Sequence, residues 1–314
     1  MMRVDRTEAW LLGAGLALAL GALVLPSWLT FLLTIAFAKG LVVQGVVIQM
    51  RAGLVSFGQG LYYCIGGYTV GVGGQMVGVH DAFALLLLSM AAAAAVAMVL
   101  GLLLTRYREI FFAMLTLAFS MILYGILSKS QSLGSTDGFN VRAVTALGWA
   151  PGAGGKMFVY VLTCGCAAVA AVLLHRLSKS SVGHVCEAIR ENEVRVEYLG
   201  VSPRWMLYAT YVLAAATSAL GGGLIGMATG HVDPEMAYWT TSGEFIFIAL
   251  LGGISHVAAP FLAATLFSTV RTYAIQFVPH SWQMILGFVL LGIIIFLPKG
   301  LWSLFRRTKA EARA

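Results

Sequence analysis

The sequence contains little charge. Asp, Glu, Lys and Arg make up only 11% of its 314 residues, whereas a typical soluble domain carries about 25%. Hydrophobic residues account for 60%, and the mean hydropathy is +0.88. Because a soluble fold cannot hide this much apolar surface, the composition excludes a soluble protein and predicts that most of the chain lies in lipid. The 36 Gly residues suit close helix packing in a bilayer.

Groups that could carry out chemistry are also scarce. The first three of the four cysteines, Cys64, Cys164, Cys166 and Cys186, lie in apolar stretches, where Cys usually packs as a small side chain. The Cys-X-Cys pair has neither a nearby His nor a second pair, so we expect no metal site. The sequence shows no His-Glu-X-X-His spacing, no Ser-His-Asp order and no phosphate-binding loop. We therefore expect neither an enzyme nor a cofactor held by this chain.

The sequence contains ten apolar stretches, and all but one approach the length of about 20 residues that a membrane helix needs. They cover residues 10–25, 30–50, 60–79, 82–105, 110–128, 157–175, 206–229, 244–254, 257–277 and 281–297. The sequence therefore predicts an all-α, polytopic transmembrane bundle of about ten segments in one domain, 1–314. We interpret the first stretch as a membrane helix and not as a removed signal. Residues 51–59 are Gly-rich and predict either a re-entrant or a broken entry to the third segment. The stretch 244–254 is too short to span alone in a straight helix.

Lys and Arg are unevenly distributed between the two sides of the predicted membrane. With a cytoplasmic N-terminus and alternating segments, fifteen of them fall inside, and only Lys129, Arg142 and Lys156 fall outside. This bias predicts that both termini are cytoplasmic. It also explains the net charge of +7 without nucleic-acid binding, which we do not expect. The longer connections are then a periplasmic loop, 129–156, and a cytoplasmic loop, 176–205, with a basic cytoplasmic tail at 299–314.

The cytoplasmic loop is predicted to contain a short amphipathic helix. Six of the eleven residues from 187 to 197 are charged, and Val185, Ile189, Val196 and Leu199 recur at helical spacing. A helix lying on lipid headgroups is typically basic, whereas this one has four acids and two bases, which favours a protein partner. The residues expected to contact that partner, including a Gly at the C-terminal stop, are Glu187, Arg190, Glu191, Asn192, Glu193, Arg195 and Gly200.

Polar residues at membrane depth are candidates for a solute path, to which we assign Lys39, Ser56, Gln59, Thr116 and Glu244. Ser56 and Gln59 either line this path or pack between helices with satisfied hydrogen bonds. A charge such as Lys39 costs roughly 2.5–3.5 kcal/mol on insertion scales. We favour a displaced helix boundary with its amine snorkelling outward, because no carboxylate stands out as its partner. Glu244 either contacts solute or pairs with another helix.

The predicted outer loop before Glu244 contains two acidic residues, Asp233 and Glu235. They either meet a soluble docking protein or belong to an ordinary wet loop. We assign them to docking. For Trp239 in the same loop we favour an interfacial aromatic anchor.

Several motifs occur in order over nearly the whole chain. They are Gly53-Leu-Val-Ser-Phe-Gly-Gln59 with Gly66-Gly-Tyr68, Tyr107-Arg-Glu-Ile-Phe-Phe-Ala-Met-Leu-Thr-Leu-Ala118, Thr136-Asp-Gly-Phe-Asn140, Glu187-Ala-Ile-Arg-Glu-Asn-Glu193 with Leu199-Gly200, Leu251-Gly-Gly253 and Leu297-Pro-Lys-Gly-Leu301. Together they resemble the LivM-type permeases of branched-chain amino acid ABC transporters. The stretch Glu187–Glu193 followed by Leu199-Gly200 is the most specific of them.

This resemblance implies a subunit of the bacterial inner membrane paired with a second, LivH-like permease. It also implies two ATP-binding subunits below, which hold ATP-Mg, and a periplasmic solute-binding protein above. Residues 187–200 would match the loop that contacts the ATPase. The family implies amino acids as the first substrate class, with urea, amides or small organic acids as alternatives.

Two other classes of function remain as alternatives. An ion-coupled secondary transporter would need membrane-embedded carboxylates or an ion site at broken helices, and the acidic residues here lie almost entirely outside the predicted segments. A membrane enzyme would need a cluster of ionisable groups in one plane of the bilayer, which the sequence does not indicate.

Overall fold

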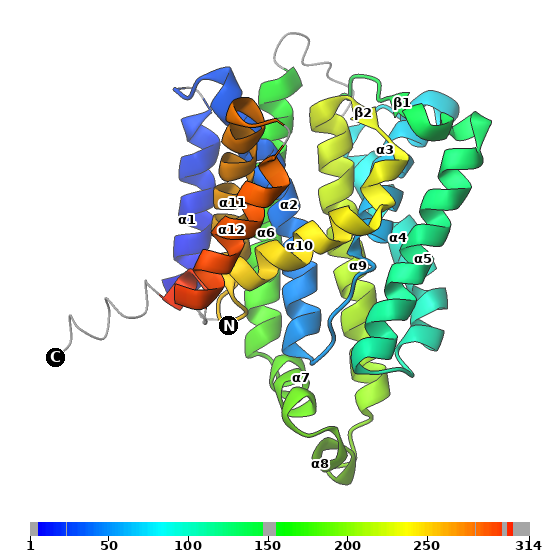
Figure 1. Cartoon of the computed structure of the whole chain (residues 1–314), viewed down its shortest axis with the longest axis vertical. Helices are drawn as coiled ribbons and strands as arrows, with labels where there is room; N and C mark the ends of the chain where they lie inside the picture. The colour runs from blue at the N-terminus through cyan, green and yellow to red at the C-terminus, as the bar shows by residue number, and fades with distance from the viewer. Residues whose placement is uncertain (1–5, 23, 147–154, 280, 297–299, 304–314) are drawn as a thin grey trace, which may run out of the picture.

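The computed structural model describes residues 6–22, 24–146, 155–279, 281–296 and 300–303, and these are almost entirely helical (Figure 1). The α-helices are α1 (Arg6–Gly21), α2 (Ser27–Arg51), α3 (Gln59–Val72), α4 (Ala82–Leu104), α5 (Glu109–Lys129), α6 (Gly155–Lys179), α7 (Ser181–Glu191), α8 (Glu193–Tyr198), α9 (Pro203–Thr229), α10 (Trp239–Gly252), α11 (Ala259–Phe277) and α12 (Trp282–Phe296). Every predicted apolar stretch overlaps a helix. Within the described residues, five helices are long and apolar enough to cross a membrane by themselves, namely α2, α4, α5, α6 and α9.

Helices α2 and α9 form the centre of the bundle, and α9 also packs closely on α3 and α4. Glycines allow this approach. A Cβ atom on Gly66 of α3 would lie 2.1 Å from the backbone oxygen of Ala219, and one on Gly222 of α9 would lie 1.9 Å from that of Tyr63. Real atoms cannot approach so closely, so the α3–α9 contact depends on small residues, as is common between membrane helices.

The chain between α2 and α3 is not helical, in agreement with the break predicted for residues 51–59. Gly53 has φ +81°, and residues 54–56 form no regular structure before α3 begins at Gln59. In Figure 1 this segment rises from the lower end of α2 into the bundle. Helix α3 is therefore short, and it continues into a π-helical turn, η1 (Gly73–Val77).

The polar end opposite α7 carries a two-stranded antiparallel sheet. Strands β1 (Phe139–Asn140) and β2 (His231–Val232) pair Phe139 with Val232, beside the 3₁₀ turns η2 (Gln131–Leu133) and η3 (Ser135–Asp137). This pairing joins the two predicted outer loops at one surface.

The predicted outer loop before residue 244 extends only to η5 (Pro234–Ala237), because α10 already begins at Trp239. Met236 and Ala237 are buried, and η5 packs against α3 and α5. Figure 1 shows α10 running obliquely across the middle of the bundle. The loop therefore folds inward, since its apolar side chains gain more from packing than from exposure to water.

The predicted cytoplasmic helix is in fact two helices, α7 and α8, below the rest of the bundle (Figure 1). The break is at Asn192, whose extended backbone ends α7 and whose side chain caps α8 by accepting from the Arg195 N–H at 3.1 Å. Gly200 has φ +82°, as expected for a helix stop. The expected apolar face is wrong at Leu199, which is 80% exposed because the bend at Asn192 turns it away from Ile189.

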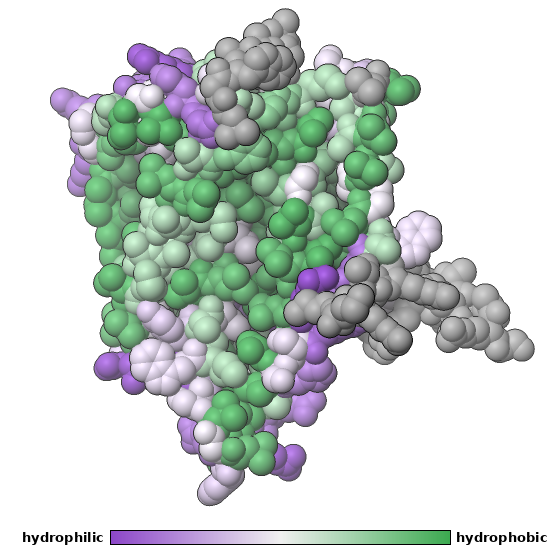
Figure 2. Space-filling model, turned by 180° about the vertical axis from the view of Figure 1, so that it is seen from behind, coloured by the Kyte–Doolittle hydropathy of each residue, from purple (hydrophilic) through white to green (hydrophobic). Residues whose placement is uncertain are grey.

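A broad apolar surface separates two polar ends on the face shown in Figure 2. Large exposed apolar side chains occur on α4 at Leu87 and Val99 and on α6 at Leu173. Such a surface is unstable in water and suits contact with lipid chains.

Replacing Gly66 by Ala tests the α3–α9 contact. We expect a loss of about 1–3 kcal/mol in unfolding free energy, because the new methyl group would overlap the backbone of Ala219. Thermal unfolding of the purified protein in detergent measures this. The control is Gly125→Ala on α5, where a Cβ atom meets nothing within 4 Å. Equal midpoints for the two variants would contradict the close contact.

Candidate functional site

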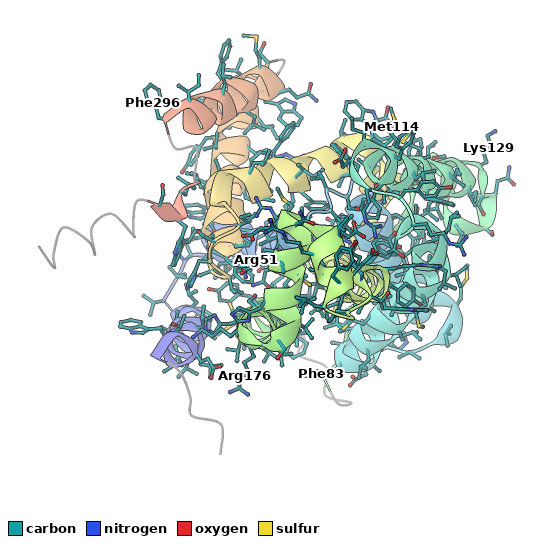
Figure 3. The ribbon with its side chains drawn as sticks, turned by 90° about the horizontal axis from the view of Figure 1, so that it is seen from below. Arg51, Phe83, Met114, Lys129, Arg176 and Phe296 are labelled. Carbon is teal, nitrogen blue, oxygen red and sulfur yellow. The ribbon has the colours of Figure 1, made fainter. Side chains whose placement is uncertain are left out.

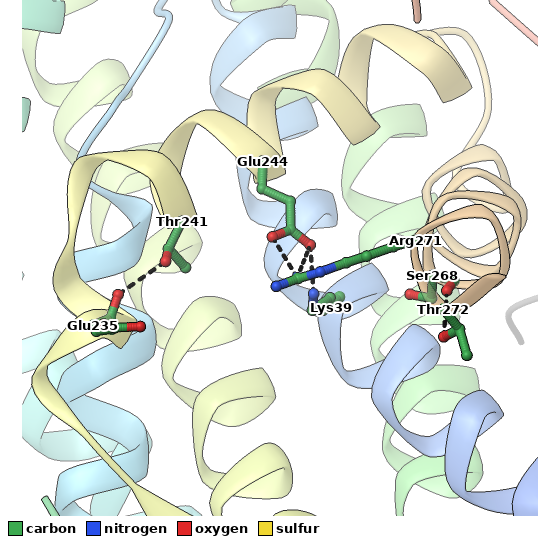
Figure 4. Close-up of polar contacts among 7 residues, drawn as sticks. All are labelled: Lys39, Glu235, Thr241, Glu244, Ser268, Arg271 and Thr272. Atoms are coloured by element: carbon green, nitrogen blue, oxygen red, sulfur yellow. Dashed lines mark hydrogen bonds and ion pairs between the residues drawn. The ribbon is translucent and has the colours of Figure 1, made fainter. Parts of the chain in front are cut away.

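Three charged side chains from three helices meet inside the bundle (Figure 4). Glu244 of α10 accepts hydrogen bonds from Lys39 of α2 and from Arg271 of α11, whose Nη1 lies 3.0 and 2.8 Å from the two carboxylate oxygens. Lys39 is the midpoint of the 25-residue helix α2, about 18 Å from either end. All three groups therefore lie at membrane depth, where an unpaired charge is costly.

This cluster corrects the interpretation of Lys39. The residue is 9% exposed within a continuous helix, so the expected displaced boundary with a snorkelling amine is wrong. Its carboxylate partner is Glu244, which is 205 positions away in the sequence and therefore could not be recognised there. Of the two alternatives for Glu244, the structure shows pairing with other helices.

The other three residues assigned to the path lie where the broken α2–α3 segment joins α3, and all are buried. Ser56 accepts from the Gly58 N–H at 3.2 Å, and Thr116 of α5 accepts from the Phe57 N–H at 3.1 Å. Gln59 donates to the Gln49 side chain at 2.8 Å and accepts from Ser218 at 2.6 Å. Ser56 and Thr116 thus satisfy the irregular backbone, and Gln59 joins side chains of α2 and α9. The place of these residues in a solute path stays a prediction.

Hydroxyl groups from other helices complete this junction. Ser242 of α10 accepts from the Gly60 N–H at 3.0 Å, and Ser120 of α5 donates to the backbone oxygen of Ala237 at 2.7 Å. The start of α3 is thus held by α5 and α10 together.

A large apolar cavity lies elsewhere, between α1, α6 and α11. Its volume is about 1330 Å³, and its lining includes Leu18, Cys164 and Leu266. None of the residues assigned to the path lines it. Among the described residues, no group of three His, Cys, Asp or Glu side chains could hold a metal ion.

Helices α7 and α8 have a buried side and a charged side. Cys186, Ile189 and Val196 pack into the same apolar cluster as Ala52 and Leu54 of the broken segment. The charged side is exposed at Glu187, Arg190, Glu191, Arg195 and Glu197. An apolar patch at the tip of α8 is also exposed, with Tyr198 88% accessible. This arrangement leaves charges and an apolar patch available to another molecule.

Two contacts connect these helices to the bundle. A Cβ atom on Gly53 would lie 3.4 Å from the Cα of Arg190, so α7 rests against the turn that opens the broken segment. Glu193 accepts from the Arg108 guanidinium at 2.6 and 2.9 Å, which ties α8 to the start of α5. Of the residues predicted to meet a partner, only Glu193 forms an ion pair within the described part of the chain.

Nearby, Arg51 joins three elements at the lower end of α2, on the side seen in Figure 3. Its Nε donates to the Ile254 oxygen and its Nη1 to the Ser178 hydroxyl, both at 2.7 Å. At the same end, Arg176 of α6 pairs with Glu8 of α1 at 2.9 Å. The start of α1 and the end of α6 therefore lie on the side of α7.

At the opposite end, Asp233 is partly exposed and Glu235 is exposed. Glu235 contributes its backbone oxygen to the Thr241 hydroxyl at 2.9 Å, which fixes the turn from η5 into α10 (Figure 4). Its carboxylate remains available, and docking at these two residues stays a prediction.

Sequence reasoning missed Arg271, Arg108, Ser218 and Ser242. The position of Arg271 inside an apolar stretch is itself a signal of function. No sequence signal identifies the two serines, because their roles depend on backbone groups that are distant in the sequence.

Comparison with known proteins agrees with this arrangement. The family described as "Branched-chain amino acid transport system / permease component" matches residues 28–295. The chain belongs to this family.

Relatives of this permease family member carry matching names. The high-affinity branched-chain amino acid transport system permease protein LivM of Escherichia coli (strain K12) is 27% identical over 283 residues, covering 83% of this chain and 66% of LivM. BraD of Pseudomonas aeruginosa is 25% identical over 40% of the chain and 41% of BraD. LivH of Escherichia coli (strain K12) is 23% identical over 39% of the chain and 40% of LivH. The chain thus spans just under two thirds of LivM, and no solved structure matches it.

Replacing Glu244 by Gln tests the charge cluster. We expect a loss of about 3–5 kcal/mol of stability, because Lys39 and Arg271 would remain as two unpaired cations. Thermal unfolding in detergent is the measurement. Lys39→Met should cost less, since Glu244 keeps Arg271, and Glu235→Gln on the exposed turn is the matched control. A Glu244→Gln variant as stable as this control would contradict the assignment.

Proposed function

We propose that this chain is an inner-membrane permease subunit of an ATP-driven ABC importer. It translocates a small polar solute, with branched-chain or related amino acids as the first choice, delivered by a periplasmic binding protein. The observation that carries this proposal is the pair α7–α8 in a member of the permease family. Its apolar side packs on the broken α2–α3 segment, and its charged side is exposed.

The proposed assembly contains a second, LivH-like permease, two ATP-binding subunits that hold ATP-Mg, and the solute-binding protein. The names of the relatives support this, since LivM and LivH are both permease proteins of a branched-chain amino acid transport system. In the bilayer we propose about ten membrane segments with both termini cytoplasmic. The Arg176–Glu8 pair supports this orientation, because it places the start of α1 beside the end of α6.

Coupling would pass from the ATPase to the solute path through two contacts. A partner that moves α7 also moves the turn at Gly53, and a partner that moves α8 pulls on α5 through Glu193 and Arg108. Both routes converge on Thr116, which holds the broken segment. Differential binding of the ATPase to two arrangements of these elements would shift the equilibrium between them.

Glu244 raises the alternative of an ion-coupled transporter, since it is a membrane-embedded carboxylate. Such transporters use carboxylates that gain and lose a proton or cation. Glu244 already has two cationic partners, which occupy both of its carboxylate oxygens. This pairing favours the ATP-driven importer.

Thiol labelling tests the orientation. We expect Tyr198→Cys on α8 to react with a membrane-impermeant maleimide only in inverted vesicles, and Ser132→Cys on η2 only in intact cells. Background from Cys186 should be low, because burial, with the negative charge of Glu187, raises the pKa of its thiol. Little thiolate then exists near pH 7, and labelling of Cys186 should rise with pH. Labelling of Tyr198→Cys in intact cells would exclude contact with a cytoplasmic ATPase.

Charge reversal tests the coupling. We expect Arg190→Glu combined with Glu193→Arg to uncouple ATP hydrolysis from uptake, with normal membrane insertion, because it reverses an exposed charge on α7 and the charge that links α8 to Arg108. Uptake and phosphate release are measured in proteoliposomes that contain all partner subunits.

The swap Arg108→Glu with Glu193→Arg is the control, because it restores an internal ion pair while reversing the charge on α8. If the swap variant recovers coupling, the effect of Glu193→Arg comes from loss of the ion pair with Arg108, which joins α8 to α5. Normal coupled uptake by the Arg190→Glu, Glu193→Arg variant would refute the proposed role of α7–α8.

A further inference from the structure

The cluster at Glu244 contains more positive than negative charge. Lys39 and Arg271 share the single carboxylate of Glu244, and one of its oxygens accepts from both cations. Within the described residues, the three side chains form ion pairs only with one another. One positive charge is therefore uncompensated at membrane depth, where proteins usually pair such groups.

Arg271 also has unused hydrogen-bond donors. Only its Nη1 donates to a residue that the structure describes, and both of those bonds go to Glu244. The Nε and Nη2 groups form the side edge of the guanidinium. Neither donates a hydrogen bond to any residue that the structure describes. Two parallel N–H groups on this edge match the two oxygens of a carboxylate.

The environment holds this edge in a defined orientation. The Arg271 guanidinium lies over the Trp282 ring, and the distance from its Cζ atom to the ring centroid is 5.1 Å. One turn earlier on α11, the buried Ser268 hydroxyl has no hydrogen-bond partner among the described residues. A guanidinium held over an aromatic ring with two free donors is suited to a polar ligand, because these donors gain a partner that the described residues do not supply.

The side chain of Arg271 is accessible. It is 34% exposed, compared with 15% for Glu244 and 11% for Lys39. A guanidinium is not stable against lipid chains. The exposed part of the Arg271 side chain must therefore face water or a polar molecule inside the assembly. A lipid headgroup does not fit, because the cluster lies near the middle of α2 and headgroups lie at the membrane surfaces.

We propose that Arg271, supported by Lys39, binds the carboxylate of the solute as it crosses the membrane. This inference rests on the proposed importer function and specifies its substrate class. An amino acid or another carboxylic acid places its two oxygens on the free edge of Arg271, and Glu244 keeps both cations in place. Urea and neutral amides lack a full negative charge and leave the excess positive charge uncompensated, so they are disfavoured.

Saturation-transfer NMR tests this on the complete transporter in nanodiscs, because the method detects weak binding. The probes are isovalerate and its neutral counterpart isovaleramide, which have the same carbon skeleton. We expect the isovalerate signal to exceed that of isovaleramide, and Arg271→Gln to weaken isovalerate binding about tenfold, the size expected for a charge-assisted hydrogen bond. Arg271→Lys should restore part of the binding, and Arg142→Gln, at an exposed outer position, should change nothing.

Two results would overturn the proposal: equal signals for the two probes in the wild-type complex, or isovalerate binding that Arg271→Gln leaves unchanged. The comparison of probes needs no variant, so misfolding of Arg271→Gln does not affect it. ATP-driven solute uptake by the same wild-type complex is measured in parallel. Uptake without preference for a carboxylate would refute this inference and retain the importer, whereas absence of any ATP-driven uptake would refute the importer itself.

Discussion

The absence of water inside a bilayer is the constraint on which this structure depends. Each backbone polar group and each charge at membrane depth needs a polar partner, because lipid chains supply none. The broken segment between α2 and α3 shows the consequence. Its N–H groups at Phe57 and Gly60 are satisfied by hydroxyls of Thr116 on α5 and Ser242 on α10. Non-helical backbone persists here because neighbouring helices supply the acceptors.

The same hydrogen bonds place the broken segment between α7 and the interior of the bundle. Below it, α7 touches Gly53 and packs with Leu54. Above it, Gln59 joins Gln49 on α2 and Ser218 on α9. A displacement of α7 would therefore reach α2, α3, α5, α9 and α10 through a single short stretch of chain. Packed elements of this kind tend to change between discrete arrangements, which suits alternating access.

The charge cluster is a polar site inside a bundle whose outer surface is largely apolar. The face in Figure 2 is broadly apolar, whereas Glu244, Lys39 and Arg271 meet between α2, α10 and α11. Conversion of such a cluster to apolar residues often costs a protein nothing in stability. Its presence at membrane depth is therefore better explained by transport than by stabilisation, and membership of the permease family agrees with this.

Composition and pattern were sufficient to predict the membrane environment, the apolar helices, the break near Gly53 and the helix stop at Gly200. These features depend on local properties, namely runs of apolar residues and the freedom of Gly to adopt positive φ. The motifs at residues 53–59 and 187–200 were likewise sufficient to predict the family.

Only the tertiary structure decided that Lys39 is paired, that α10 begins at Trp239 inside the bundle, and that Arg108 holds Glu193. These contacts join residues separated by up to 205 positions, and no local periodicity encodes them. The bend at Asn192 also escaped prediction, because the charged residues on both sides of it continue a helical pattern. A sequence determines which groups require partners, and the packing of helices determines which partners they find.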